Sequence, residues 1–563
     1  MNWKKYKSLP EKEKKEETYY IIGLDIGNDS SGIAFYNIAG AEPEIIDLSG
    51  GYGRPTIPTA MQYIVESKEW VFGEYAILNR GMGKEITLTN LIERLGSSEY
   101  IDIDNKPVSV INLLGMYIKE LLSNVKNINP KAEIAGIVTS IPSYFSSQAR
   151  EELTRAFKSA GYEKELIGLI TDRECIFAYH YSKMTENMTG NMTGNKDKLK
   201  AKQNILLLDY GAREVRGGVY VNEGNVNEGQ KSQEGQKSQI NQINQKSQAL
   251  KSLSSLFEDS IGTKMIEDQV KKLFTNYYMT NNPVQAHQGL DRSLSEQIMA
   301  FTYQHKDILF QKAIRGKPAK LYFNFAFPPF QQTVSGSDAE NLIEPFRKRF
   351  NQFIRQILEK SITKEGEKVT ATDIDVVICI GGGFEMLWAK EAAGSLFHQG
   401  KLQFYKNSKA VTAMGAAVAA AGLLGALVQP ETLALADFDP PEIEDRHQLS
   451  VDIGLKLKDE RFIPLAECNS FWWQPHPPRL FIVNAPVDGE IPLSILARSP
   501  EGETNILSDT ILTGMPARPK GTTRLSMQLK FLSDSEATVM VKDSGFGEIF
   551  PASGYEREIS LKI

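Results

Sequence analysis

Apolar and polar positions divide the chain into two differently patterned regions. From residue 19 to about residue 425, short apolar runs typical of buried strands alternate with segments whose apolar residues recur at helical spacing. Helical periodicity covers 144–160, 262–279, 294–314 and 337–361. Residues 447–563 instead show short alternating runs separated by Gly, Pro, Asp and Asn, without a helical signal. The pattern predicts a mixed α/β domain followed by an antiparallel all-β domain.

Three further segments lack the pattern of a folded core. Residues 1–18 form a charged, solvated tail, and the proline-rich, acidic stretch at 426–446 is typical of a linker. Slipped repeats of Asn, Gln, Ser, Gly and Lys at about 184–200 and 222–247 contain too little apolar surface to order themselves. We therefore predict an α/β domain at 19–425 with two low-complexity insertions, a linker at 426–446 and a β domain at 447–563.

The α/β region contains one sequence pattern twice. IIGLDIGNDSSG (21–32) and NILLLDYGAREVRG (204–217) each place an apolar strand before an Asp-x-Gly turn that leads into a second strand. Glycine in such a turn adopts backbone angles closed to other residues, so that successive amides can point at a phosphate. Asp25 and Asp209 stand at the strand ends, where a carboxylate can hold Mg²⁺ through water. The two turns predict a nucleotide-phosphate site.

A third glycine-rich segment, VVICIGGGFEML (376–387), joins a strand to a helix through Gly381, Gly382 and Gly383. Its amides could approach the sugar or base of a nucleotide, and a tight strand-to-helix turn explains the glycines equally well. Close helix packing is the better explanation of the small-residue segment AVTAMGAAVAAAG (410–422) taken alone. Neither a Walker nor a Rossmann glycine motif occurs in the sequence.

Composition limits the other functions. With 41% hydrophobic and 24% charged residues and a formal net charge of −6, the chain has ordinary globular composition and no sign of a nucleic-acid partner. Its three cysteines are far apart, which fits a reducing compartment. The charged N-terminus resembles no signal peptide, and the longest apolar stretch, 410–428, reads as a buried helix. We expect a cytoplasmic monomer without a membrane anchor.

In this order and spacing, the motifs resemble the nucleotide-binding fold shared by actin, sugar kinases and heat-shock chaperones. The resemblance is greatest to the seventy-kilodalton heat-shock chaperones of the DnaK type, because IVTSIPSYFSSQAR (137–150), LSVDIGL (449–455) and GMPARPKG (514–521) are similar to segments of that family. The resemblance implies an actin-like (duplicated ribonuclease H-like) nucleotide-binding domain and a β-sandwich that binds peptide. The sequence ends without the family's helical lid segment, which we expect to be missing.

The resemblance also implies roles for individual residues. Asp25 and Asp209 match the aspartates that organise Mg²⁺ for catalysis, and Asp172 stands for a glutamate at a helix start. Pro142 and Arg150 match residues that relay the nucleotide state between domains. The positions implied to contact ATP or ADP are Gly27, Asn28, Asp29, Gly211, Ala212, Lys306, Gly381, Gly382 and Gly383. The positions matching the apolar peptide groove are Ile453, Phe481, Ile491 and Leu493, with the sandwich core as the alternative.

Several departures from the family pattern concern catalysis. Where the family has a threonine and an aspartate after its second turn, this chain has Glu214 and Arg216. The stretch 87–96, where a catalytic lysine is expected, contains no lysine. We therefore expect weak or absent ATP hydrolysis, although Lys84, Arg213 or Arg216 could re-supply positive charge.

We predict a heat-shock-type chaperone that binds ATP or ADP, Mg²⁺ and extended apolar segments of unfolded proteins, with co-chaperones as possible further partners. One alternative is a pseudo-ATPase scaffold whose β domain holds a dedicated partner. A sugar or small-molecule kinase is the second alternative, and it gives the β domain no role.

Overall fold

A computed structural model of the chain divides it into two compact units. One unit comprises residues 1–142 and 148–444, and the other comprises 143–147 and 445–563. The residues that the structure describes are 19–38, 42–49, 54–80, 83–128, 133–143, 145–186, 203–222, 250–282, 291–313, 318–326, 328–363, 366–424, 443–444, 449–456, 461–468, 470, 476, 478–483, 490–500, 502–519, 522–532, 536–545 and 551–563.

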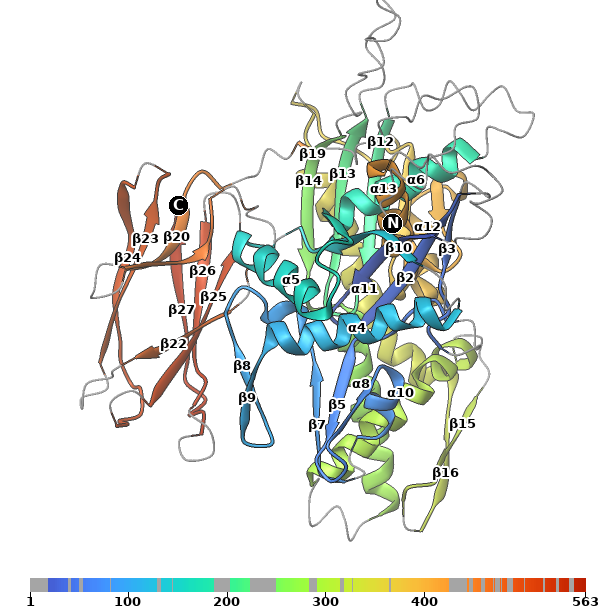
Figure 1. Ribbon diagram of the computed structural model, residues 1–563, viewed down its shortest axis with the longest axis horizontal. Helices are drawn as coiled ribbons and strands as arrows, with labels where there is room; N and C mark the ends of the chain where they lie inside the picture. The colour runs from blue at the N-terminus through green and yellow to red at the C-terminus, as the bar shows by residue number, and fades with distance from the viewer. Residues whose placement is uncertain are drawn as a thin grey trace, which may run out of the picture. The chain divides into compact units, whose positions relative to one another are not determined.

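Two six-stranded sheets with the same central topology organise the first unit (Figure 1). In the first sheet, β1 is parallel to β10 and antiparallel to β2, which is antiparallel to β3. In the second sheet, β12 is parallel to β17 and antiparallel to β13, which is antiparallel to β14. The first sheet consists of β11 (Leu166–Thr171), β10 (Glu133–Ile141), β1 (Tyr19–Ile26), β2 (Ser30–Asn37), β3 (Glu42–Ile45) and β4 (Ile57–Pro58). The second consists of β18 (Leu402–Phe404), β17 (Val376–Ile380), β12 (Gln203–Tyr210), β13 (Val215–Asn222), β14 (Leu250–Glu258) and β19 (Ile443–Glu444).

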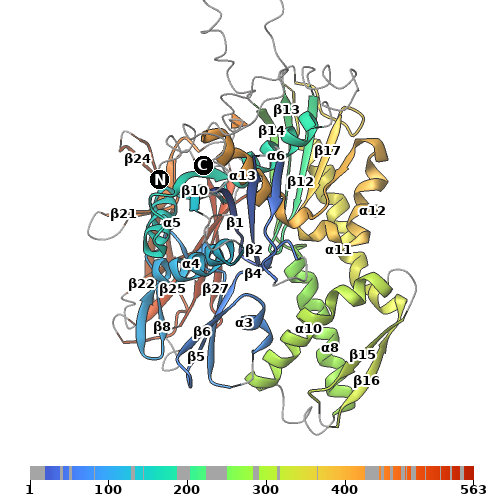
Figure 2. The same ribbon diagram turned by 45° about the vertical axis from the view of Figure 1, so that its right-hand side comes forward.

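This duplication confirms the predicted fold class, an actin-like α/β region followed by an all-β region. Figure 2 shows the two six-stranded sheets side by side, with β1 in one and β12 in the other. Because the two turns occupy equivalent places in the two sheets, the repeated sequence pattern corresponds to a repeated structural unit. The predicted domain boundaries stay a prediction, and the tail 1–18 and most of the two insertions and the linker lie outside the described residues.

Helices and small sheets complete the first unit. The helices are α3 (Glu74–Leu78), α4 (Val110–Ile128), α5 (Ser147–Ala160), α6 (Asp172–Glu186), α8 (Thr263–Asn281), α10 (Arg292–Ala313), α11 (Gly336–Lys360), α12 (Leu387–Leu396) and α13 (Val411–Leu423). Single 3₁₀ turns lie at η1 (Ile92–Arg94), η2 (Gly382–Glu385), η3 (Gln399–Lys401) and η4 (Ser408–Ala410). The remaining strands are β5 (Ala60–Ile64), β6 (Glu69–Phe72), β7 (Glu85–Thr89), β8 (Tyr100–Ile103), β9 (Lys106–Ser109), β15 (Ala319–Phe323) and β16 (Phe330–Val334).

Helix α11 illustrates how the sequence specifies its own element and packing. Ser335 Oγ accepts a hydrogen bond from the Asp338 amide, and the Asp338 carboxylate accepts one from the Ser335 amide, so a capping box begins the helix. Its buried side chains recur at helical spacing and pack on β13 and β14 of the second sheet; they are Ala339, Ile343, Phe346, Phe350, Phe353, Ile354 and Ile357. Burial of this face stabilises the helix more than propensity does.

Helix α13 packs against β1, β2 and β10 of the first sheet and against α6. Its alanines are buried in the core, which agrees with the packing explanation of the small-residue segment. No helix in the described part of the chain is long and apolar enough to span a bilayer.

The second unit consists of two four-stranded antiparallel sheets, ordered β21-β20-β23-β24 and β22-β25-β26-β27. Alternate residues of both sheets form one apolar core. The strands are β20 (Asp452–Lys456), β21 (Phe462–Ala466), β22 (Arg479–Val483), β23 (Ile491–Arg498), β24 (Thr504–Leu512), β25 (Thr523–Phe531), β26 (Glu536–Asp543) and β27 (Glu556–Lys562).

Burial of His180 on α6 predicts that the first unit loses stability in acid. Its side chain is 3% exposed and its Nδ1 lies 2.5 Å from the Tyr405 hydroxyl. Burial lowers the pKa of His180 from 6.5 to about 4. The unfolded chain binds a proton at this residue below pH 6.5, whereas the folded chain binds it only near pH 4. The contribution of neutral His180 to stability is therefore present above pH 6.5 and is lost as the pH falls towards 4.

Because His180 takes up a proton, we expect acidification from pH 6.5 to 4 to reduce the unfolding free energy by up to about 3 kcal/mol. Urea unfolding of the full chain at a series of pH values should show a shallower pH dependence for His180→Gln than for the unaltered chain. His398→Gln, which removes an exposed histidine, provides the control against which the slope of His180→Gln is compared. Equal slopes for all three proteins would contradict the prediction.

Candidate functional site

The two Asp-x-Gly turns have the same backbone geometry. In the first, the Gly27 amide donates to the Ser30 carbonyl at 3.0 Å, and in the second the Gly211 amide donates to the Glu214 carbonyl at 3.0 Å. Neither glycine has a positive φ, so the expectation of special backbone angles is wrong for both. An added Cβ would instead lie 2.9 Å from the Ser30 oxygen or 3.0 Å from the Glu214 oxygen. The tight turn requires glycine because of this close approach.

Three aspartates lie at the ends of elements that meet at these turns. Asp25 is near the end of β1, Asp209 is near the end of β12, and Asp172 is the first residue of α6. Ser140, near the end of β10, donates its hydroxyl to Asp25 Oδ1 at 2.5 Å. The structure therefore brings the three predicted catalytic aspartates into mutual electrostatic range, because the charges of Asp172 and Asp25 both act on Asp209.

The pKa of each strand-end aspartate is raised. Loss of solvation raises the pKa of Asp25 to about 6; the Ser140 hydrogen bond opposes this shift, and the Asp172 charge adds to it. Loss of solvation raises the pKa of Asp209 to about 7, against the opposing charge of Arg216. Both carboxyls therefore take up protons at a higher pH than an ordinary aspartate does.

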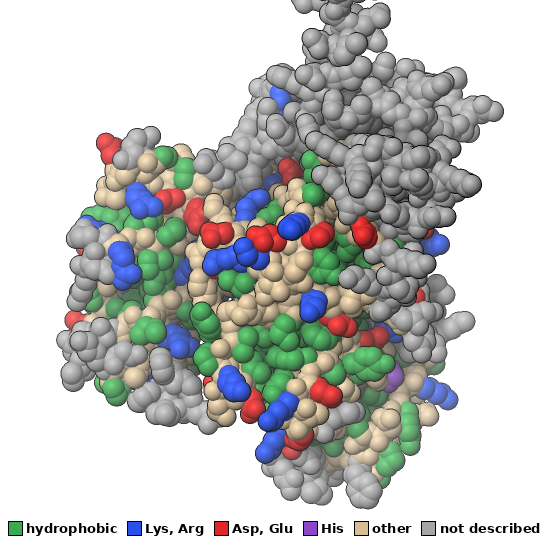
Figure 3. Space-filling model, viewed as in Figure 1, with side chains coloured by type: hydrophobic (Ala, Val, Ile, Leu, Met, Phe, Trp, Pro, Cys, Tyr) green, Lys and Arg blue, Asp and Glu red, His purple; other side chains and the backbone are tan. Residues whose placement is uncertain are grey.

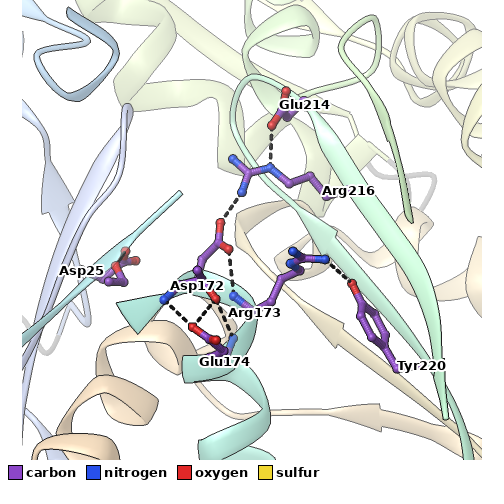
Figure 4. Close-up of polar contacts among 9 residues, drawn as sticks. Asp25, Asp172, Arg173, Glu174, Glu214, Arg216 and Tyr220 are labelled. Carbon is purple, nitrogen blue, oxygen red and sulfur yellow. Dashed lines mark hydrogen bonds and ion pairs between the residues drawn. The ribbon is translucent and has the colours of Figure 1, made fainter. Parts of the chain in front are cut away.

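Arg216 lies within this group of acids. In the β12–β13 hairpin it stands directly opposite Asp209, so the two side chains share a face of the sheet. Its guanidinium pairs with Asp172 through Nη1 and with Glu214 through Nε (Figure 4). Asp25, Asp172, Asp209, Glu214 and Arg216 are called the strand-end cluster below.

The second arginine of the turn, Arg213, is also paired. It forms an ion pair with Glu93 of η1, and the Asn28 side chain donates to the other oxygen of Glu93 at 2.6 Å. Glu93 therefore connects the first turn to the second. The loop that follows it is anchored by the buried Glu152, whose carboxylate accepts the amides of Gly96 at 2.7 Å and Ser98 at 3.2 Å.

The helix α8 begins directly against the second turn. The amides of Thr263 and Lys264 donate to the carbonyls of Gly211 at 3.1 Å and Ala212 at 2.7 Å. These bonds satisfy first-turn amides of the helix and fix the turn in place. Ala212, a predicted nucleotide contact, is therefore held through its carbonyl by α8.

The glycine-rich loop after β17 packs on the second turn. Gly381 has φ of 90°, and an added Cβ would lie 2.8 Å from Asp209 Oδ1. A Cβ on Gly383 would lie 2.1 Å from the Tyr210 ring, and one on Gly382 would lie 2.8 Å from Lys409 Cε. Close contacts with Asp209 and Tyr210 thus explain Gly381 and Gly383, whereas the Lys409 side chain could move away from a Cβ at position 382. Gly381 is also brought beside the strand-end cluster.

Lys306 belongs to a second charged group on α8 and α10. Its Nζ lies 3.0 Å from Glu267, and Lys264 lies 3.7 Å from the same carboxylate. Although burial opposes ionisation, these two lysines lower the pKa of Glu267. Lys306 also lies over the Tyr303 ring, and the Asp29 charge acts on Tyr303. Lys306 and Asp29 thus both lie near Tyr303, and the Glu267 carboxylate balances the positive charge of Lys306.

The two predicted relay residues flank the end of β10. Pro142 directly follows that strand, and Arg150 lies on α5. Partial burial lowers the pKa of Arg150, and the charge of Glu174, two residues after Asp172, raises it. Arg150 is therefore electrostatically connected to the start of α6, which carries one member of the strand-end cluster.

All four residues predicted for a peptide groove are buried in the core of the β unit. Ile453 is completely buried, and Phe481, Ile491 and Leu493 are each less than one-tenth exposed. Their position favours the alternative that they are sandwich core, and their role in peptide binding stays a prediction.

Sequence reasoning identified Glu214 and Arg216 as departures but missed Glu93, Ser140 and Glu267. Ser140 precedes the Ile-Pro pair at the end of β10, and the parallel pairing of β10 with β1 brings it to Asp25. Glu267 follows Lys264 at helical spacing, which is a detectable signal. Glu93 gave no signal, because its partners come from turns far away in sequence.

Comparison with known proteins gives a distant relationship over nearly the whole chain. Residues 42–267 match the C-terminal model of a family of unknown function (DUF5716), and residues 448–563 match a domain of unknown function (DUF8552). The chain is 22% identical over 543 residues to the chaperone protein DnaK of Thermosipho melanesiensis, covering 94% of this chain and 79% of the relative. It is 21% identical to DnaK of Thermosipho africanus over the same shares of the two chains. DnaK of Thermotoga maritima is 22% identical over 550 residues, covering 95% of this chain and 80% of the relative.

These matches show a distant homology to the DnaK chaperones and support a divergent protein of the seventy-kilodalton heat-shock type.

Proposed function

We propose that the chain is a heat-shock-type chaperone whose first unit binds ATP or ADP with weak or lost hydrolysis and whose β unit binds extended apolar polypeptide. The observation that carries the proposal is the pair of equivalent strand-end turns, each with an aspartate and a tight glycine turn, in a chain distantly homologous to DnaK. All three cysteines are free thiols, which supports a reducing, cytoplasmic location within this proposal.

The charges around the turns support weak or lost hydrolysis. Phosphoryl transfer depends on positioned cations that are available to the phosphate. Arg213 is paired with Glu93, and Arg216 is paired with both Asp172 and Glu214. The arginines that could have replaced the missing lysine are therefore occupied by acids of the chain itself.

Exposed apolar residues on β22 support the peptide-binding part of the proposal. Leu480 and Ile482 are 56% and 64% exposed, whereas Phe481 between them points into the core. Among the described strands, β22 pairs with β25 alone, so it is an edge strand of its sheet. An edge strand offers backbone groups that an extended peptide can pair with, and neighbouring apolar side chains add contact area. Figure 3 shows apolar side chains at the surface on the left-hand side, over strands of this unit.

Replacing both outward residues, Leu480→Ser with Ile482→Ser, should weaken binding of a fluorescent apolar peptide by about tenfold or more, because both apolar contacts are lost. Anisotropy titration of the full chain measures the change. Ile506 on β24 is 60% exposed on the other sheet, so Ile506→Ser serves as the matched control and should leave the affinity unchanged. Equal loss in the control, or no loss in the double variant, would contradict the assignment to β22.

A non-enzymatic scaffold is the second candidate, favoured by the ion pairs Arg213–Glu93 and Arg216–Asp172. Each pair joins the second turn to an element that precedes it in sequence, so acids of the chain itself hold both arginines. Peptide release distinguishes the two candidates. An active chaperone releases bound peptide faster when ATP is added, and a scaffold releases it at one rate with or without ATP. The kinase alternative receives no support from the homology to DnaK.

A further inference from the structure

Arg216 differs from its counterpart in the first turn. In the β1–β2 hairpin the residue opposite Asp25 is Gly32, whereas in the β12–β13 hairpin the residue opposite Asp209 is Arg216. The duplicated framework therefore carries a fixed positive charge at one of two equivalent positions. This charge lies beside the aspartates that the resemblance implies for Mg²⁺.

The guanidinium contacts acids on several elements. It pairs with Glu214 on its own hairpin and with Asp172 at the start of α6. Its charge also acts on Asp25 at the end of β1 and on Asp209 directly opposite. Arg216 is 23% exposed, whereas Glu214 and Asp172 are 8% and 14% exposed, so the pairs are largely withdrawn from solvent. The positive charge of Arg216 thus acts on all four acids of the strand-end cluster.

These residues do not fit a magnesium ion. Mg²⁺ requires near-octahedral oxygen ligands and retains several waters, which needs open space in front of the carboxylates. A guanidinium is permanently charged, contributes no ligand oxygen and repels a second cation. In the described part of the chain, no group of three or more His, Cys, Asp or Glu side chains is placed to hold a metal ion.

We infer that the Arg216 guanidinium takes the place of the divalent cation, so that the strand-end cluster binds no Mg²⁺ and any nucleotide held there binds free of metal. The exclusion of the metal rests on the two ion pairs of Arg216 and on its position opposite Asp209. The statement about nucleotide rests on the proposed function, and the two are tested separately.

Mn²⁺, a paramagnetic substitute for Mg²⁺, tests the first statement on the full chain without nucleotide. Electron paramagnetic resonance measures the loss of the free Mn²⁺ signal as protein is added. The unaltered chain should retain no stoichiometric Mn²⁺. Arg216→Asp, which replaces the cation by a carboxylate, should bind Mn²⁺ at least about tenfold more tightly. Arg213→Asp, which adds the same charge at the neighbouring ion pair, is the matched control and should bind no more Mn²⁺ than the unaltered chain.

Calorimetric titration with ATP tests the second statement. The unaltered chain should bind ATP with the same affinity in EDTA and in excess Mg²⁺, whereas Arg216→Asp should require Mg²⁺. If no protein binds ATP under either condition, the proposed nucleotide binding fails, while the Mn²⁺ measurement still decides the exclusion of metal.

Two results would overturn the inference. One is stoichiometric Mn²⁺ binding by the unaltered chain that disappears in Asp209→Asn. The other is equal Mn²⁺ binding by Arg216→Asp and Arg213→Asp, which would show that Arg216 is not the group that excludes the metal.

A second variant, Arg216→Gln, is used if circular dichroism shows that Arg216→Asp does not fold. It removes the charge but keeps hydrogen-bonding atoms. It should then bind Mn²⁺ more tightly than the unaltered chain, and equal binding would overturn the inference.

Discussion

ATP turnover by the full chain is expected to be at least about a thousandfold slower than that of a DnaK control such as the Thermotoga maritima protein. Loss of one positioned charge-stabilising group typically lowers kcat by a factor of about 10²–10³. Here the charged groups around the second turn are acidic or already paired. Glu214 and Glu93 add negative charge, and Arg216 and Arg213 are each paired with an acid. Two like charges 4 Å apart repel by about 4 kcal/mol at an effective dielectric constant of 20.

A steady-state assay of phosphate release checks this expectation, with both proteins at one temperature. Asp209→Ala provides the control for contaminating ATPase, because residual turnover that belongs to this chain should fall further in that variant. Turnover within about tenfold of the DnaK control, abolished by Asp209→Ala, would contradict the expectation and would establish an active ATPase.

Arg518→Ala is expected to reduce the unfolding free energy of the β unit by about 3–5 kcal/mol, because it leaves a buried carboxylate without its partner. The Arg518 guanidinium donates to both oxygens of Asp543, at 2.8 and 2.7 Å, and the two side chains are 5% and 0% exposed. The amides of Gly545 and Ser553 also donate to this carboxylate. Burial alone would raise the pKa of Asp543, but the hydrogen bonds from Arg518 and Ser553 outweigh it and hold the pKa below its usual range.

Urea unfolding of the full chain, followed by hydrogen exchange in β25 and β26, measures the loss. Lys542→Ala is the matched control, because it breaks an ion pair of similar length, 2.8 Å, whose side chains are both about half exposed. Such a surface pair contributes at most about 1 kcal/mol. If Arg518→Ala costs no more than Lys542→Ala, the buried pair does not stabilise the β unit.

The helices and strands could be predicted from the sequence because their determinants are local. The four segments predicted as helices correspond to α5, α8, α10 and α11, and for α11 the capping box and the apolar spacing are both visible in the sequence. The repeated Asp-x-Gly pattern likewise indicated a repeated unit, and the two sheets have the same central topology. Hydrophobic residues that recur every two positions in a strand, or every 3.6 in a helix, indicate which face is buried, wherever that element lies.

The candidate site could be predicted only in part. Asp25, Asp172 and Asp209 were identified from motifs or from resemblance, and the structure brings their charges together. The sequence alone also suggested Lys84, Arg213 or Arg216 as a source of positive charge, without indicating the partners of the two arginines. Those partners, Glu93 and Asp172, lie on η1 and α6, and sequence distance gives no information about such contacts.

The residues predicted to bind peptide could likewise be identified only in part from the sequence. Alternation along β22 and β23 correctly separates the two faces of each strand, but it does not indicate which face is covered. The packing of the two sheets buries Phe481, Ile491 and Leu493 and leaves Leu480 and Ile482 outside. The packing of the two sheets therefore decides which residues are available to a peptide.

By itself, the sequence determined the elements, their amphipathic faces and the duplicated turns, because propensity, periodicity and turn chemistry act within a few residues of each other. Only the tertiary structure decided the charge balance at the strand ends. Burial and long-range pairing set that balance, and both depend on elements that are distant in the chain. This is why Asp25 and Asp209 suggest a magnesium site in the sequence, whereas the folded protein places the Arg216 guanidinium among the same carboxylates.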